Sequence, residues 1–114
     1  MKYLLLIYNE ENPAAWEAMP QAEQQALIGE YRAVSALPNT LGANQLQPVA
    51  TATTVRVNDG QTLATDGPFA ETKEVLGGYY LVEASDLDEA IAIAAKIPAA
   101  RNGGCVEVRP IVEM

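Results

Sequence analysis

The chain has 114 residues, of which 49% are hydrophobic and 19% charged. This composition is typical of one globular domain and excludes an intrinsically disordered chain. Its 15 acidic and 7 basic residues give a formal net charge of -8, which disfavours binding to nucleic acid or to an anionic membrane surface. We therefore expect a single globular domain over residues 1–114.

Histidine is absent from the sequence. Ser-His-Asp and Cys-His catalytic arrangements and His-ligated zinc are therefore excluded. Neither a metal-ligand spacing nor a phosphate-binding glycine loop is present, because Gly77-Gly78 and Gly103-Gly104 lack the Gly-Lys-Ser/Thr that such a loop needs. We expect no cofactor.

The first predicted element is a strand over residues 2–8. Its apolar run is too short for a signal peptide or a membrane span. With one cysteine, Cys105, the chain fits a reducing compartment, and we expect it in the cytoplasm. The strand is apolar on both alternating faces, which predicts cover on both sides: Tyr3, Leu5 and Ile7 lie on one face, and Leu4, Leu6 and Tyr8 on the other.

A short helical turn starting at Asn12-Pro13 and a main helix over residues 20–37 follow. Leu27, Tyr31 and Val34 have the spacing of an inward-facing stripe. A second strand is predicted over residues 41–47. The run TTVRVNDGQTLAT, residues 53–65, predicts a β-hairpin that turns at Asn58-Asp59-Gly60.

The last third of the chain repeats the strand, helix and strand order. Residues 78–84 predict a strand. Ser85 and Asp88 have the spacing of a capping box at the start of a helix that ends by Pro98, and residues 105–112 predict the last strand. This order predicts an α+β, ferredoxin-like βαββαβ fold with an inserted β-hairpin and helices on one face of an antiparallel sheet.

The apolar second face of the sheet needs its own cover. A second copy packed sheet against sheet would provide it and form a homodimer with the shape of a dimeric α+β barrel. The alternative is that the hairpin folds back over its own sheet.

Residues 65–80, TDGPFAETKEVLGGYY, contain most of the unusual chemistry. One interpretation is structural: Asp66 bonds to the backbone ahead of it, and Pro68 starts a turn after the hairpin. The other is a small-molecule pocket with apolar walls and a few polar groups. Its members would be Asp66, Glu71, Lys73 and Glu74 beside Phe69, Tyr79 and Tyr80.

Three further side chains are candidates with ordinary structural alternatives. The hydroxyls of Tyr8 and Tyr31 fit a cleft between helix and sheet, and they fit equally well as core tyrosines with the hydroxyl at the rim. Cys105 has no His or clustered cations to activate it, so we expect a buried, inert thiol.

The MKYLLLIY opening and the run from TTVRV to VEVRP, with DGPFAETKE and GGYY at its centre, resemble the YCII-related family, specifically its DGPF-motif branch. The resemblance implies a ferredoxin-like dimeric α+β barrel. It also implies, for some members, an enzyme with a His-Asp pair in the cleft between helices and sheet, and related barrels include muconolactone isomerases. Members of the branch are often encoded beside extracytoplasmic-function sigma factors.

Because this chain has no histidine, the resemblance carries over only Asp66 and its motif neighbours Gly67, Pro68, Phe69, Glu71 and Lys73. We expect a homodimer that binds a small organic molecule in the helix–sheet cleft, with these residues, Tyr8, Tyr31 and Tyr79 around it. Catalysis would be proton transfer on a carbonyl compound, with Asp66 as base and Lys73 and a tyrosine stabilising negative charge. The alternative is a non-catalytic accessory protein that contacts a partner such as a sigma factor.

Overall fold

A four-stranded antiparallel sheet forms the centre of the molecule. The computed structural model describes residues 1–114, and its strands lie in the order β2-β5-β1-β6. They span Lys2–Asn9 (β1), Thr40–Gln45 (β2), Val75–Glu83 (β5) and Cys105–Pro110 (β6). The two central strands are therefore β1 and β5, and each pairs with the other and with one edge strand.

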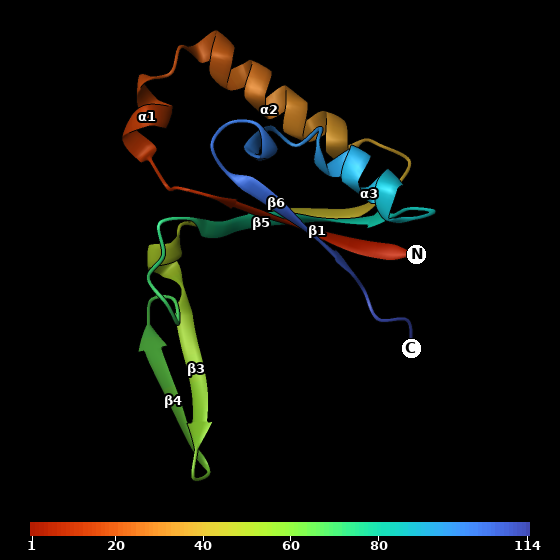
Figure 1. Cartoon of the computed structure of the whole chain (residues 1–114). Helices are drawn as coiled ribbons and strands as arrows, with labels where there is room; N and C mark the ends of the chain where they lie inside the picture. Colours follow the sequence, from red (N-terminus) through yellow and green to blue (C-terminus); the bar gives the residue numbers. More distant parts are fainter.

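The helices lie on one face of this sheet (Figure 1). They span Pro13–Ala18 (α1), Gln21–Ser35 (α2) and Leu87–Ala94 (α3), and Pro98–Ala100 adds a short 3-10 turn (η2). No helix is long and apolar enough to cross a membrane. The order of strands and helices confirms the predicted ferredoxin-like α+β fold with an inserted hairpin.

The core lies between the helices and the sheet. Along β1, burial alternates as the sequence predicted: Tyr3, Leu5 and Ile7 are buried, whereas Leu4, Leu6 and Tyr8 are only half-buried. Every member of the core is apolar or aromatic, so helix–sheet packing rests on the hydrophobic effect. The twelve are Tyr3, Leu5, Ile7, Val34, Tyr80, Val82, Ala84, Ala90, Ile93, Ala94, Ile97 and Ala99.

The other face of the sheet has no helix over it (Figure 1). The strand register puts Leu4 opposite Leu81 and Leu6 opposite Tyr79, and directly opposed residues share a face. Tyr8 continues this row on β1, and it pairs with Leu76 after a register shift. The uncovered face therefore carries a largely aliphatic and aromatic row down its two central strands.

The hairpin forms a separate two-stranded sheet and projects from the side of the uncovered face (Figure 1). Its strands span Thr53–Asn58 (β3) and Gln61–Asp66 (β4), and a short 3-10 turn, η1, precedes it at Val49–Thr51. Asp59 and Gly60 both have positive φ, 50° and 77°, as a tight two-residue connection requires. The hairpin is confirmed, and it does not fold back over its own sheet.

Helix α3 begins one residue later than the predicted capping box. Asp86, with extended backbone, accepts a hydrogen bond from the Glu89 backbone N–H at 2.9 Å. The Glu89 carboxylate in turn accepts one from the Ser85 N–H at 3.1 Å. The assignment of Ser85 and Asp88 was therefore wrong by one position, because Asp and Glu at the same spacing make the same reciprocal bonds.

The molecule has much more surface than a compact chain of its size. Its accessible surface is 8027 Å², whereas a compact monomer of 12.2 kDa has about 6,100 Å². Its radius of gyration is 16.2 Å, against about 13 Å for a compact domain of this length. The projecting hairpin and the one-sided sheet account for both differences.

Gly104 should be essential for folding. A Cβ at this position would collide with the Tyr8 carbonyl oxygen and lie 3.0 Å from the Asn9 Cβ. We expect Gly104→Ala to lower the free energy of unfolding by about 2 kcal/mol or more, measured by urea denaturation. Gly29→Ala is the matched control: its Cβ would meet nothing within 4 Å, and alanine should add about 0.5–1 kcal/mol in a helix. Equal stability of both variants would contradict the close approach.

Candidate functional site

The DGPF corner, residues Asp66 to Phe69, lies at the foot of the hairpin. Gly67, with φ 96°, donates its N–H to the Ala52 carbonyl at 2.7 Å. Its own carbonyl accepts from the Thr54 hydroxyl at 2.8 Å. The corner is therefore well fixed, as the structural interpretation of this stretch predicted, and glycine is needed there for its backbone conformation.

Within this fixed corner, the side chains of two candidate residues, Asp66 and Phe69, are exposed. Asp66 ends β4, and its carboxylate makes no hydrogen bond or ion pair within the chain. Phe69 is 81% exposed, an unusual position for the only phenylalanine of the sequence. A carboxylate and an aromatic ring are thus both available to a molecule from outside the chain.

Tyr8 and Tyr79 lie on the uncovered face of the sheet. Asn44 on β2 donates its side-chain N–H to the Tyr79 hydroxyl at 3.0 Å, so this tyrosine is held against the sheet. The foot of the hairpin is at the end of the sheet where β1 finishes and β5 begins (Figure 1). The structure thus brings Tyr8 and the DGPF corner to one end and one side of the sheet, which we call the sheet end, whereas Tyr79, opposite Leu6, lies in the middle of the same face.

The loop over residues 67–74 connects the corner to this same end. Lys73 forms an ion pair with Glu10, just after β1, with Nζ 3.5 Å from Oε1. The Lys73 side chain is 84% exposed, so this pair contributes little to stability. Glu71 is also exposed. Glu10, which sequence reasoning did not select, is the carboxylate that pairs with the ammonium.

Cys105 is exposed, and the prediction of a buried thiol was wrong. It starts β6 opposite Tyr8, at the edge of the sheet rather than under the helices. Its thiol donates to the Glu74 carboxylate, with Sγ 3.6 Å from Oε2. Desolvation, the bond to Glu74 and the charges of Glu74 and Glu107 all raise the pKa of the Cys105 thiol.

Tyr31 lies apart from the other predicted site residues. It is on α2, above the helix-covered face of the sheet, whereas Tyr8 and Tyr79 are on the uncovered face. Burial raises the pKa of the Tyr31 hydroxyl, and its backbone carbonyl accepts from the Tyr80 hydroxyl at 2.8 Å. Tyr31 therefore packs beside the core, and one cleft does not hold both Tyr8 and Tyr31.

The expected cleft between helices and sheet is filled. The twelve core side chains occupy the space between the two layers, so the chain offers no ligand site where the sequence suggested one.

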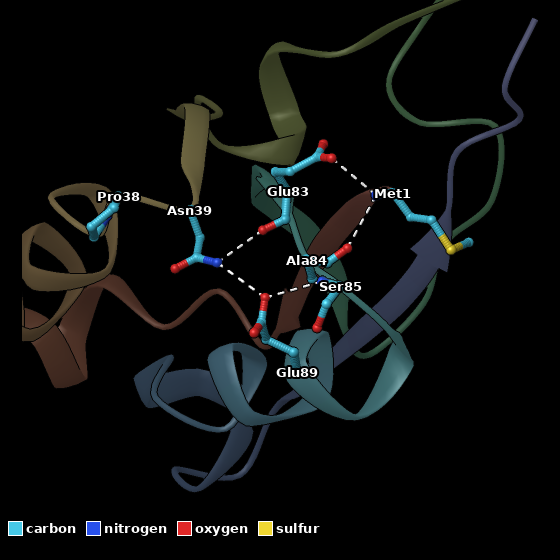
Figure 2. A pocket seen from close by; sticks show the side chains of 7 residues that line it. All are labelled: Met1, Pro38, Asn39, Glu83, Ala84, Ser85 and Glu89. Carbon is cyan, nitrogen blue, oxygen red and sulfur yellow. Dashed lines mark hydrogen bonds and ion pairs between the residues drawn. The ribbon is translucent and has the colours of Figure 1, made fainter.

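Two open pockets lie elsewhere and contain no predicted site residue. One, of about 340 Å³, is at the sheet edge by the N-terminus. Figure 2 shows that its polar groups bond to one another: the N-terminal ammonium to Glu83 at 2.9 Å, and the Asn39 amide to the Glu83 carbonyl and the Glu89 carboxylate. These groups satisfy one another's hydrogen-bonding capacity. The pocket is therefore better explained as the place where the N-terminus is bound to the sheet than as a ligand site.

The second pocket, of about 380 Å³, lies in the helix layer between α2 and the segment that follows α3. Its Arg101 is paired with Glu30, which leaves mainly the aliphatic Ala33, Val34 and Leu37 along its wall. No group of three or more acidic or cysteine side chains is placed to hold a metal ion. The sheet end remains the place where the motif residues gather.

Comparison with known proteins gives two matches. The model of the YCII-related domain family matches residues 1–114. An uncharacterized protein of Rhizobium meliloti (strain 1021) is 38% identical over 119 residues, which covers 97% of this chain and 92% of the relative.

The contact between Cys105 and Glu74 gives a prediction for thiol reactivity. Replacing Glu74 by glutamine removes a charge that raises the thiol pKa, so Glu74→Gln should increase the thiolate fraction. We expect faster alkylation by iodoacetamide at any fixed pH below that pKa, with the midpoint of the rate–pH curve at lower pH. Glu71→Gln, which removes the same charge from the same loop, should leave the rate unchanged. Identical curves for wild type and Glu74→Gln would contradict the contact.

Proposed function

This chain belongs to the YCII-related family, and from that premise we propose that it works as a homodimer which pairs its uncovered sheet faces and holds a small organic molecule at the sheet end. The observation that carries the proposal is the surface of the single chain. It exceeds that of a compact monomer by about 1,900 Å². A standard interface buries about 800 Å² per partner, so the excess is large enough to supply such an interface.

The chemistry of the uncovered face supports the same proposal. Four apolar or aromatic side chains lie side by side on the two central strands: Leu4, Leu6, Tyr79 and Leu81. A sheet-on-sheet contact would remove them from water. Soluble monomers rarely leave a contiguous apolar patch of several hundred Å² in water. The two sheets would form the closed barrel that the sequence predicted.

The proposed ligand site is at the sheet end rather than under the helices. The space under the helices is occupied by core side chains, whereas Asp66 and Phe69 make no contact that would have to be broken by a ligand. A second chain over the uncovered face would shield them from water. An apolar wall with a few polar groups is the usual make-up of a small-molecule site.

Proton transfer is the reaction that these groups suit. Asp66 would remove a proton next to a carbonyl group, and the ammonium of Lys73 or the hydroxyl of Tyr8 would stabilise the negative charge on the oxygen. In the single chain Lys73 is paired with Glu10. Ligand binding would therefore have to compete with an exposed, weak ion pair, which costs little.

We expect wild-type protein to sediment as a dimer at micromolar concentration and Leu6→Lys to raise the dissociation constant at least about thirtyfold. Leu6 lies in the middle of the uncovered face. Its β6 neighbour is Glu107, so a lysine there gains an opposite charge, and the monomer should stay folded. Analytical ultracentrifugation measures the change.

Leu87→Lys is the matched control, because Leu87 is an exposed leucine at the start of α3, on the other side of the molecule. It should leave the dissociation constant unchanged. A wild-type chain that remains monomeric at about 100 μM, well above the range of stable dimers, would overturn the proposed dimer.

Ligand binding can be tested by thermal shift with a panel of small lactones and oxo acids. A compound at about 100 times its dissociation constant adds about 2.7 kcal/mol to stability. We expect at least one compound to raise the melting temperature of wild type, and Asp66→Asn to remove that shift. Asp59→Asn, the same change at the hairpin tip, should retain it. A shift that survives Asp66→Asn would remove Asp66 from the site.

A second candidate function is contact with another protein, and the exposed Phe69 together with the charge of -8 favours it. The resemblance suggests a sigma factor with a basic surface as the partner. Such a complex should weaken steeply as salt rises, because its attraction is electrostatic. An apolar dimer of two acidic chains should instead hold or strengthen, because salt screens their mutual repulsion.

A further inference from the structure

The hairpin over residues 53–66, which we call the arm, has almost no contact with the rest of its own chain. All residues of β4 and all of β3 except Thr54 are exposed. An isolated two-stranded hairpin is only marginally stable in water. The arm as it stands in one chain therefore lacks the packing that such an element needs.

The two faces of the arm differ in character. Val55 pairs with Ala64, and Val57 pairs with Thr62, so these four side chains share one face. Val55 is 60% and Val57 69% exposed. Arg56 and Asn58 alternate with them and point to the other face. One face of the arm is thus mostly apolar and has nothing packed on it, whereas the other face carries Arg56 and Asn58 beside a single apolar side chain, Leu63.

Hydrogen bonds hold the segments on both sides of the arm at its foot. The Glu11 carboxylate accepts from the Val49 N–H at 2.9 Å, and the Gly67 N–H reaches Ala52 at 2.7 Å. Between Val49 and β2, the Leu46 N–H donates to Gly77 of β5 at 2.9 Å. The bonds of Val49 and Leu46 tie the segment before the arm to the main sheet and its flanking loop, and the bond of Gly67 closes the base of the arm. In this arrangement nothing in the same chain covers Val55 and Val57.

We infer that this cover is a second copy of the chain: the arm of each protomer packs its Val55–Val57 face along the other protomer. The inference rests on the proposed dimer. The arm projects on the side of the uncovered sheet face (Figure 1), which is the side that the second copy would occupy. A twofold axis through that interface would then place both arms alongside the partner.

The area of the chain agrees with this extended contact. The excess of about 1,900 Å² is more than twice what one standard interface buries per partner. The uncovered face of four short strands is one contributor, and the fully exposed arm is the other. With the arm in contact, the DGPF corner at its foot would lie where the two chains meet, and each ligand site would be incomplete in a single chain.

Val57→Lys tests the inference, with Asn58→Lys as the matched control on the adjacent, opposite-facing position. Each chain has a charge of -8, so an added lysine reduces repulsion between two copies, and weaker pairing cannot result from charge. We expect Val57→Lys to raise the dimer dissociation constant at least about tenfold and Asn58→Lys to change it less than about twofold. Sedimentation measures both, and circular dichroism checks the fold.

A photo-cross-linking side chain at position 57 gives a readout that does not depend on dimer stability. It should yield covalent dimers on irradiation, and the same group at position 58 should not. One outcome would overturn the arm contact and leave the proposed dimer standing: Leu6→Lys separates the wild-type dimer, Val57→Lys leaves its dissociation constant unchanged, and the group at position 57 gives no covalent dimer. Equal effects at positions 57 and 58 would overturn the face assignment, and a monomeric wild type would remove both proposals together.

Discussion

The structure depends on a sheet whose two central strands are apolar on both faces. On β1, Tyr3, Leu5 and Ile7 are buried under the helices, and this burial is the main stabilising contact of the chain. Leu4 and Leu6 point the other way and are only half-buried. A strand that contributes alternate residues to one core does not need apolar residues at the positions between them. The apolar side chains of Leu4 and Leu6 on the uncovered face therefore require a separate physical reason.

A close approach between two backbones shapes the sheet near the candidate site residues. Gly78 allows the backbone of β5 to lie close to that of β2. A Cβ at this position would be 2.9 Å from the Asn44 carbonyl oxygen. This spacing keeps β2 and β5 paired up to Gln45, directly before the segment that leads into the arm. Gly78 thus permits the strand pairing from which the chain leads into the arm.

The sequence was sufficient where local patterns decide the structure. Alternation predicted both faces of β1, and Asp59-Gly60 predicted the turn of the arm, because these signals depend on neighbouring residues. It was insufficient where distant segments decide: Cys105 was predicted to be buried, and Tyr8 and Tyr31 to share a cleft. A strand such as β1 has two alternating sets of side chains. Whether Tyr8 faces the helix layer or the uncovered side depends on which of these sets the helices cover. Helical spacing on α2 cannot supply that information for a strand.

The distribution of charge is compatible with the proposed pairing of two acidic chains. On the uncovered face, Lys2 and Arg109 stand against Glu83 and Glu107: Lys2 is opposite Glu83, and Arg109 bonds to Glu107 at 2.9 Å. This face therefore contributes no net charge, and the formal -8 of the chain lies on its other surfaces. In the proposed dimer, the charged strand residues of the two faces would balance one another, and physiological salt would screen much of the repulsion among the remaining charges. The acidic surplus would then lie mainly outside the proposed sheet-on-sheet contact, which would rest on hydrophobic burial.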